Sequence, residues 1–403
     1  MATQAKHFNY LLIGGGMAAD QAAAGIRSID QNGTIAILSA DVDEPYARPA
    51  LSKKLWVDET FQESDTDFKT AEKQNVEIHL QTTVTKIDPA AHQVETAAGT
   101  TYAYDKLLLA TGVKANTLPN LPNSDLIVAL RSKADYRKIR AFSGQQKQVL
   151  VVGNGYIGSE IAAGLIQSDT QVSYVIDTPH LFDKKFPANL SQQLEEKYQQ
   201  AGVKFYPSKR ATAVKIPDHR VILTLDDGTE LAGDGLVLGL GSHSDYRLAQ
   251  TASLKLDKNG VIVNKNLQTS DPDIYAAGDL ISYPDPILGQ TKSEHVMHAT
   301  KSGFAAGQNM AGQTTAYNYT PYFYSWVFDV SWEAIGTIRT DLTMYQEKLG
   351  VKGNLTYYFD QNDTLQGILK WNAKVNLNHL RNLLSQHPQL TELKKVLPLT
   401  QVD

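Results

Sequence analysis

The stretch VLVVGNGYIGSEIAAGLI, residues 149–166, reads as a short apolar strand, a glycine-rich turn and a helix. Its glycines Gly153, Gly155 and Gly158 fit the spacing G-x-G-x-x-G. In such a turn the first glycine permits the tight bend, the second lets a diphosphate approach the backbone, and the third allows helix and strand to pack closely. The phosphates of a dinucleotide then lie at the positive end of the helix.

A second strand, QVSYVID, follows this helix and ends at Asp177, nineteen residues after Gly158. An acidic side chain at that place accepts hydrogen bonds from a ribose 2′-hydroxyl. Because a carboxylate repels a 2′-phosphate, the unit predicts NAD(H) in preference to NADP(H). His180, Lys184 and Lys185 stand nearby and keep NADPH open, and a capping or turn role is the structural alternative for Asp177.

The same pattern occurs earlier, where YLLI, GGGMAA and DQAAAGIRSID lead to the strand TIAILS. Gly14, Gly16 and Ala19 fit G-x-G-x-x-A, and the strand, turn, helix and strand have the length of one βαβ unit. The ribose acid is expected near position 40, where Ala40 stands and Asp41 follows. Either Asp41 accepts the hydrogen bonds of this ribose, or other contacts hold it.

Composition limits the alternatives. With 403 residues, 42% of them apolar, the chain predicts a globular protein of two or three domains. A net charge of −5 gives no general attraction for nucleic acid, and none is predicted as a partner. The apolar run at the N-terminus is too short for a secretory signal or a membrane span, which predicts a cytoplasmic protein. The chain contains no cysteine, so disulfides and thiolate catalysis are excluded, and no metal site is predicted.

Six motifs stand in the order IGGGMAA, PYARPALSK, LLATG, VVGNGYIGSE, LVLGLG and DIYAAGD. In this order they resemble the FAD-dependent pyridine nucleotide oxidoreductases, which use two dinucleotide-binding folds. Within that superfamily the chain is most similar to the branch of apoptosis-inducing factor and the oxygenase-coupled ferredoxin reductases. The segments FYSWVFDVSWEAIG and LTYYFDQNDTLQGILKWN resemble its C-terminal domain and indicate the apoptosis-inducing-factor side.

The resemblance implies an α/β fold with two Rossmann-like domains of the glutathione reductase type and a C-terminal α+β domain. The implied FAD-binding domain is discontinuous, 1–118 and 240–315, around an NAD(H)-binding domain at 119–239. The C-terminal interface domain is expected at 316–403. Its eight Lys or Arg residues balance eight Asp or Glu residues, so this domain predicts no basic docking face.

The resemblance also implies the FAD contacts. Arg48 would neutralise charge on the diphosphate or adenine side, and Asp279 would take the ribityl chain. Val84 matches a position that contacts adenine through its backbone, and Arg131 matches an arginine near the cofactor. The full implied set is Gly14, Gly16, Met17, Ala18, Ala19, Asp41, Arg48, Lys53, Val84, Ala110, Thr111, Gly112, Arg131, Gly278, Asp279, Glu294, His295 and Tyr324.

Lys53 matches a lysine beside the flavin N5 edge that pairs with a glutamate, here Glu160. An ammonium there favours electron acceptance because reduced flavin carries an anion. The structural alternative for Lys53 is a solvated surface lysine. For Glu160, on the first turn of its helix, the alternative is an interaction with the helix dipole. Glu294 and His295 match a pair near flavin N1 and the C2 carbonyl, and Lys53, Glu160 and His295 are the implied catalytic residues.

For the NAD(H) site, the resemblance places Tyr156 over the flavin on its nicotinamide side. The implied set is Gly153, Gly155, Tyr156, Ile157, Gly158, Glu160, Asp177 and Gly241. Tyr324 stands where relatives commonly carry tryptophan, and Trp326 stands where many carry aspartate, so stacking on the flavin is expected from Tyr324. His298 is expected to be merely hydrogen-bonded in the structure.

The implied function is an FAD-dependent NADH:acceptor oxidoreductase, with NADPH as the less favoured cofactor. Without cysteine, electrons would pass directly from the flavin to a small acceptor such as a quinone, oxygen or a dye, or to a redox protein. A ferredoxin or rubredoxin reductase is one alternative. A slow NADH-responsive switch that regulates dimerisation or partner binding is another, and a stable FAD carrier is the third. A homodimer is left open.

Overall fold

The computed structural model describes residues 5–403, and the chain divides into two compact units. The first unit comprises the chain up to Pro49, Gln62–Lys114 and His243–Pro321. The second unit comprises Ala50–Phe61, Ala115–Ser242 and Tyr322–Asp403. Two of the crossings between the units fall within β7 (Lys114–Ala115) and β16 (Ser242–His243). None of the helices in residues 5–403 is both long enough and apolar enough to cross a membrane.

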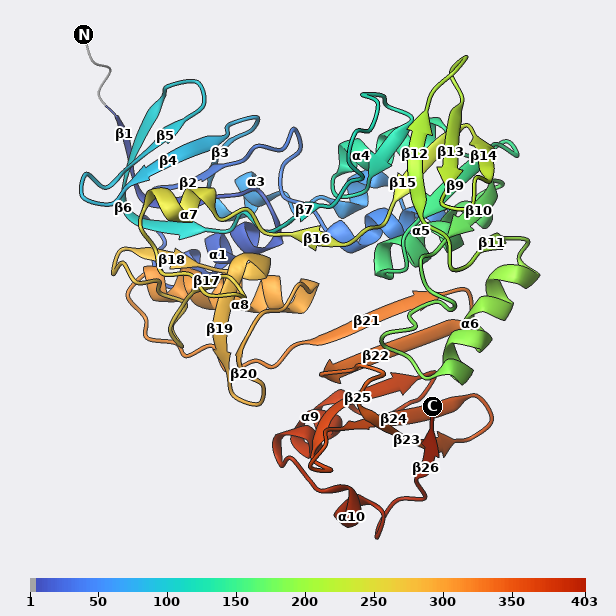
Figure 1. Cartoon of the computed structure of the whole chain (residues 1–403). Helices are drawn as coiled ribbons and strands as arrows, with labels where there is room; N and C mark the ends of the chain where they lie inside the picture. Colours follow the sequence, from blue (N-terminus) through green and yellow to red (C-terminus); the bar gives the residue numbers. More distant parts are fainter. Residues whose placement is uncertain (1–4) are drawn as a thin grey trace. The chain divides into compact units, whose positions relative to one another are not determined.

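A seven-stranded sheet forms the centre of the first unit (Figure 1). Five strands run parallel, namely β1 (Lys6–Ile13), β2 (Ile35–Leu38), β3 (Glu77–His79), β6 (Thr101–Leu109) and β18 (Ile274–Ala276). The antiparallel strands are β4 (Val84–Asp88) and β5 (Gln93–Thr96). The end of β1 and all of β2 are buried, which explains their continuous apolar sequence, as in parallel sheets covered on both faces.

Two helices of this unit, α1 (Met17–Arg27) and α8 (Val296–Met310), pack directly against each other, and α8 also contacts β6 and β18 (Figure 1). Glycines set how closely the two helices approach. A side chain at Gly307 would overlap the carbonyl oxygen of Ala22, and one at Gly303 would overlap that of Ala18. The remaining elements are η2 (Glu63–Thr66), α3 (Thr70–Gln74), α7 (Arg247–Thr251), β17 (Val261–Ile262), η3 (Gly278–Leu280), β19 (Ile281–Asp285) and β20 (Gly289–Thr291).

The second unit contains a five-stranded parallel sheet in the order β11-β10-β9-β15-β8. These strands are β8 (Ile127–Ala129), β9 (Gln148–Val152), β10 (Gln171–Val175), β11 (Lys204–Tyr206) and β15 (Gly235–Leu238). An antiparallel sheet of β12 (Ala211–Lys215), β13 (Val221–Leu225) and β14 (Glu230–Gly233) is also present. The helices are α2 (Lys54–Val57), α4 (Lys133–Ala141), α5 (Tyr156–Ile166) and α6 (Ala188–Gln200). The 3-10 helix η1 (Arg48–Ser52) precedes α2; it begins in the first unit and ends in the second.

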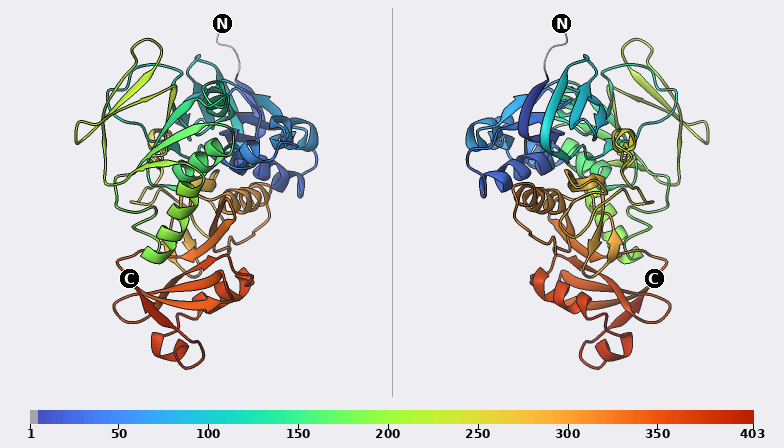
Figure 2. Two further views of the ribbon diagram at one scale, coloured as in Figure 1. Left: turned by 90° about the vertical axis from the view of Figure 1, so that its right-hand side faces the viewer. Right: turned by 90° about the vertical axis from the view of Figure 1, so that its left-hand side faces the viewer.

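The C-terminal part of the second unit is a six-stranded antiparallel sheet in the order β21-β22-β25-β24-β23-β26. Its helix α9 packs on β22 and β25, and Figure 2 shows these orange and red segments gathered together. The elements are β21 (Tyr322–Val327), β22 (Val330–Gly336), β23 (Thr343–Leu349), β24 (Gly353–Phe359), β25 (Leu365–Trp371), α9 (Leu377–Ser385), α10 (Leu390–Leu393) and β26 (Thr400–Val402).

The predicted fold class is confirmed, because each predicted βαβ unit lies in a mainly parallel sheet and the C-terminal residues form an antiparallel sheet with helices. The predicted boundaries of three domains stay a prediction. The residues around Lys53 group with the second unit, although they lie within the sequence range expected for the FAD-binding domain.

Candidate functional site

The first glycine turn joins β1 to α1 and lies close to Arg48. Gly14 has a φ of +113°, and a side chain there would overlap the carbonyl oxygen of Ala110 at the end of β6. Gly16 is the N-cap of α1 and supplies no side-chain cap. A Cβ placed on Gly16 would meet only the Arg48 guanidinium, at 3.9 Å. The N-terminus of α1 and the Arg48 guanidinium therefore lie close together, and both attract anions. Binding of the FAD diphosphate between them stays a prediction.

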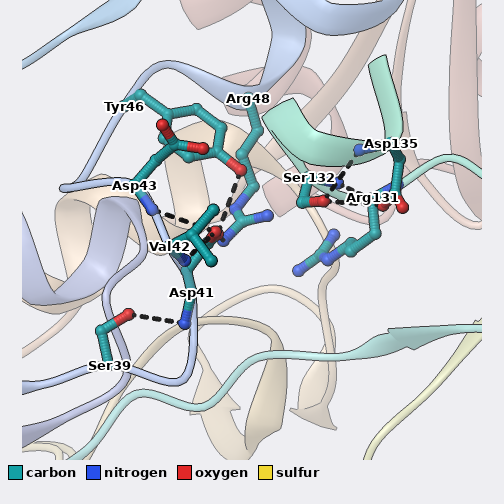
Figure 3. A network of polar contacts seen from close by, with 9 residues as sticks. All are labelled: Ser39, Asp41, Val42, Asp43, Tyr46, Arg48, Arg131, Ser132 and Asp135. Atoms are coloured by element: carbon teal, nitrogen blue, oxygen red, sulfur yellow. Dashed lines mark hydrogen bonds and ion pairs between the residues drawn. The ribbon is translucent and has the colours of Figure 1, made fainter. Parts of the chain in front are cut away.

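Asp41, the candidate ribose acid of the first unit, lies in a polar network with Tyr46 and Arg48 (Figure 3). Its Oδ2 accepts a hydrogen bond of 3.2 Å from the Tyr46 hydroxyl and lies 3.7 Å from Nη2 of Arg48. Its Oδ1 accepts the backbone N–H of Val42 at 2.8 Å. The guanidinium carbon of Arg48 lies 5.1 Å from the centre of the Tyr46 ring. Asp41 thus helps to position Arg48, and its contact with a ribose stays a prediction.

The second glycine turn, between β9 and α5, borders a cavity of about 470 Å³ within the second unit. Gly153 has a φ of +123°, and a side chain there would overlap the carbonyl oxygen of Gly239. Gly155 is the N-cap of α5 and again brings no side chain to the cap. Asp177 and Gly241 also line the cavity. A volume of this size with a helix N-terminus and an acid at the end of a parallel strand fits a dinucleotide.

Tyr156, the first residue of α5, lies among aromatic rings of its own unit. Its ring is parallel to that of Phe323, with centroids 6.2 Å apart, and it contacts Phe182 at 5.3 Å. The Lys185 ammonium lies 4.5 Å from its ring centre. Burial, and to a smaller extent the Glu160 charge, raises the pKa of Tyr156, so its hydroxyl keeps its proton at neutral pH.

Lys53 and Glu160 form a buried ion pair in the second unit. Nζ of Lys53 lies 2.6 Å from Oε1 of Glu160, and their side chains are only 11% and 3% exposed. The Ser52 hydroxyl donates to Oε2 of Glu160 at 2.5 Å, and the Ser325 hydroxyl donates to Oε1 at 2.6 Å. Tyr324 lies over the ammonium, 5.6 Å from ring centre to Nζ. Lys53 is therefore no solvated surface lysine.

The loop that carries Lys53 is fixed to α5 by Trp56. The Trp56 indole N–H donates to the carbonyl of Leu51 at 2.7 Å, and the Ser168 hydroxyl donates to the carbonyl of Trp56 at 2.9 Å. A Cβ on Gly164 would lie 2.8 Å from Trp56 side-chain atoms, so α5 has a glycine where the indole packs. This packing helps to hold Lys53 against Glu160.

In the first unit, the Gly278-Asp279 turn rests on the buried helix α8. Gly278 has a φ of +78°, its N–H donates to the Ser302 hydroxyl at 3.0 Å, and its carbonyl lies 3.2 Å from Nε2 of His298. Nδ1 of His298 lies 2.8 Å from the Tyr317 hydroxyl. Burial lowers the pKa of His298 to about 3, so the ring is neutral. His298 therefore shapes the turn that presents Asp279.

Glu294 and His295 precede α8. Glu294 forms an ion pair of 2.8 Å with Lys292, and Nδ1 of His295 accepts the N–H of Met297 at 3.2 Å as the helix cap. Their predicted contacts with the flavin, and the catalytic role of His295, stay predictions.

The other predicted residues lie at the ends of elements. Arg131 donates its backbone N–H to Asp135 at 3.0 Å, in the capping box that begins α4 (Figure 3). Val84 begins β4, and Tyr324 lies in β21. The remaining residues follow β6 or begin a helix, namely Met17, Ala18, Ala19, Thr111, Gly112, Ile157 and Gly158.

Sequence reasoning missed Ser52, Ser325 and Asn154. Ser52 stands beside Lys53 in the motif PYARPALSK, which offered a signal for it. Ser325 is 165 residues from Glu160, and no local pattern indicates their contact. Asn154, an unspecified position of the glycine motif, accepts the N–H of Phe182 at 2.7 Å and so fixes the loop beyond β10.

Comparison with known proteins gives one consistent result. The family described as "Pyridine nucleotide-disulphide oxidoreductase" matches residues 8–303. The chain is 27% identical over 394 residues to the 3-phenylpropionate/cinnamic acid dioxygenase ferredoxin--NAD(+) reductase component of Photorhabdus laumondii, covering 96% of this chain and 98% of the relative. It is 31% identical over 362 residues to the peroxisomal monodehydroascorbate reductase 1 of Oryza sativa subsp. japonica, covering 82% and 74%. The crystal structure of the ferredoxin reductase for the CYP199A2 system of Rhodopseudomonas palustris superposes with a TM-score of 0.81 at 26% identity, covering 96% and 99%.

Proposed function

Because this chain belongs to the pyridine nucleotide-disulphide oxidoreductase family and is an FAD-dependent NADH oxidoreductase, we propose that it reduces its acceptor directly, without a thiol relay. The observation that carries the proposal is the Lys53–Glu160 pair in a chain that contains no cysteine. When bound, FAD supplies the two-electron chemistry between NADH and the acceptor.

The residues have separate tasks in this proposal. Gly16 and Arg48 bind the FAD diphosphate, and the N-terminus of α5 with Asp177 binds NADH. Lys53 brings a fixed positive charge to the redox edge of the flavin, where negative charge develops on reduction. Glu160 and the two serines hold that ammonium in one position.

The acceptor is proposed to be a small redox molecule, such as a quinone. The neutral charge balance of residues 316–403 supports this choice, and one relative is named for reducing monodehydroascorbate, a small molecule. A ferredoxin-like protein is the second candidate. It is favoured by the full-length match to a ferredoxin--NAD(+) reductase component.

An acceptor panel tests the proposal. The FAD-loaded protein is given NADH together with menadione, ferricyanide, oxygen or a [2Fe–2S] ferredoxin, and NADH oxidation is followed. Fast NADH oxidation with menadione supports the proposal. NADH oxidation that is much faster with ferredoxin than with menadione supports the second candidate. Slow reduction, a persistent long-wavelength band and a change in oligomer size would instead identify a redox switch. The cytoplasmic location is also a proposal, tested by fractionation of the source cells.

A further inference from the structure

We propose that Lys185 binds the diphosphate of the dinucleotide in the cavity of the second unit, and that residues of the C-terminal sheet and of its β22–β23 loop hold it in place. This inference rests on the proposed function, because it assumes that the cavity takes NAD(H). Lys185 follows β10 by ten residues and belongs to no dinucleotide motif. Its assignment comes from contacts made by three separate segments.

The position of the ammonium is the first support. Lys185 lines the cavity together with Gly153, Asn154 and Gly155 of the glycine turn. Its Nζ lies 4.5 Å from the ring centre of Tyr156, the first residue of α5. The first amides of a helix have no partner within the helix and attract anions. A cation beside them gives a diphosphate a second, charged contact.

The glycine turn and the Lys185 segment are joined by Asn154. Its Oδ1 accepts the N–H of Phe182 at 2.7 Å, and its Nδ2 donates to the carbonyl of His180 at 2.9 Å. The N–H of Lys185 donates to the carbonyl of Phe182 at 2.7 Å, which closes a turn. The segment is thereby fixed at the edge of the cavity.

Thr340, in the loop between β22 and β23, and Tyr358, in β24, donate to carbonyl groups of the same segment. The Thr340 hydroxyl donates to the carbonyl of Asp183 at 2.9 Å, and its N–H donates to that of Lys184 at 3.2 Å. The hydroxyl of the fully buried Tyr358 in β24 donates to the carbonyl of Lys185 at 2.7 Å. With its backbone held from that side, Lys185 extends its side chain into the cavity.

The charge of Lys185 has no counter-ion among residues 5–403. No carboxylate of residues 5–403 forms an ion pair with it, whereas Lys209 in the same cavity is already paired with Asp227 at 2.7 Å. The side chain is accessible from the cavity, but the protein around the ammonium removes enough water to lower the pKa of Lys185. A partly desolvated cation is stabilised most by an anion that enters the cavity.

A 2′-phosphate would meet different residues. The N–H of Lys209 donates to the carbonyl of Ile176 at 3.0 Å, which places Lys209 and Arg210 beside Asp177 at the end of β10. Lys185 lies instead against the first residue of α5. Its contact is therefore expected to be shared by NADH and NADPH and to involve the diphosphate.

Calorimetric titration of the FAD-loaded protein with ADP-ribose, NAD⁺ and NADP⁺ tests this assignment. Lys185→Met should raise the Kd of all three ligands by about tenfold or more, because a charge-assisted hydrogen bond contributes about 1.5–3 kcal/mol. Lys185→Arg should retain most of the affinity. Lys204→Met, an exposed lysine of β11 outside the cavity, is the matched control and should bind like the original protein.

Three outcomes would overturn the assignment. Unchanged affinity in Lys185→Met excludes the contact, loss for NADP⁺ alone assigns Lys185 to the 2′-phosphate, and loss for NAD⁺ but not for ADP-ribose assigns it to the nicotinamide half. If the original protein binds no ADP-ribose, the proposed function itself fails. That result is distinct from a failure of Lys185 alone.

Tyr358→Phe tests the positioning by the C-terminal sheet. It should raise KM for NADH and the Kd of ADP-ribose severalfold while kcat stays unchanged. In the Lys185→Met background the same change should add little to the Kd, because the side chain that it positions is gone. Full additivity of the two changes would show that Tyr358 acts on binding by another route.

Discussion

The Lys53 ammonium lies 2.6 Å from the Glu160 carboxylate, and both groups are almost fully withdrawn from solvent. Burying two charges is costly unless they are paired and further hydrogen-bonded. Ser52 and Ser325 supply those further bonds, one to each carboxylate oxygen. Both carboxylate oxygens are therefore hydrogen-bonded, and the positive charge of Lys53 is held in one position.

Removing one member of the pair should be worse than removing both. Glu160→Gln leaves the Lys53 ammonium buried without an anion, and we expect a loss of about 3–5 kcal/mol in the free energy of unfolding. Lys53→Met together with Glu160→Gln should recover a large part of that loss. Urea unfolding of the three variants at neutral pH checks this, and additive losses would contradict the pairing.

The crossing of α1 and α8 should tolerate no added side chain. Gly307→Ala places a methyl group on the carbonyl oxygen of Ala22, so the helices must separate. We expect a loss of stability of about 1–3 kcal/mol or more, together with weaker FAD binding. Thermal unfolding measures the first effect. Lys301→Ala, an exposed change on the same helix, is the control, and equal melting temperatures for the two variants would refute the close crossing.

His298 should make the protein sensitive to acid. Its folded pKa of about 3 lies below the ordinary value of about 6.5, so below pH 6.5 the unfolded chain binds a proton that the native state does not. Stability should fall by up to about 1.4 kcal/mol per pH unit between about pH 6.5 and pH 3, and this contribution should be constant above pH 6.5.

Unfolding free energies measured from pH 7 to pH 5 test this dependence. The slope should be smaller in His298→Gln, whose amide can still bond to Gly278 and Tyr317 but cannot titrate. Identical slopes for the two proteins would mean that His298 is not the titrating group.

Asp177 should set the choice between NADH and NADPH. Its carboxylate lines the cavity and repels a 2′-phosphate, so kcat/KM should be higher for NADH. Asp177→Ala should lower kcat/KM for NADH by about tenfold, since it removes hydrogen bonds to a charged group. The ratio of kcat/KM for NADH to that for NADPH should therefore become smaller. Steady-state rates with both nucleotides decide this, and a preference of the unaltered protein for NADPH would show the assignment to be wrong.

The sequence predicted the parts of the site that depend on local geometry. The glycines of both motifs lie in turns between strand and helix, as their spacing indicated, namely Gly14, Gly16, Gly153 and Gly155. A tight turn depends only on residues that are close together in the sequence. Asp177 lines the cavity, as its distance from the turn predicted. The βαβ units are short enough for strand, turn and helix to be recognised together.

Contacts between distant segments were beyond local patterns. Only a family resemblance brought Lys53 and Glu160 together, and nothing indicated Ser325, whose contact depends on the register of β21. The sequence showed only that Lys185 is a positive charge near Asp177. The position of its backbone depends on Tyr358, which is 173 residues away in the chain.

Electrons are proposed to leave NADH through FAD alone, and anaerobic titration of the FAD-loaded protein with NADH tests this most directly. A chain without cysteine holds no dithiol that could store a further pair of electrons. We expect the flavin absorbance to bleach fully at about one NADH per FAD. A requirement for two NADH per FAD, or a flavin that NADH does not bleach, would contradict it.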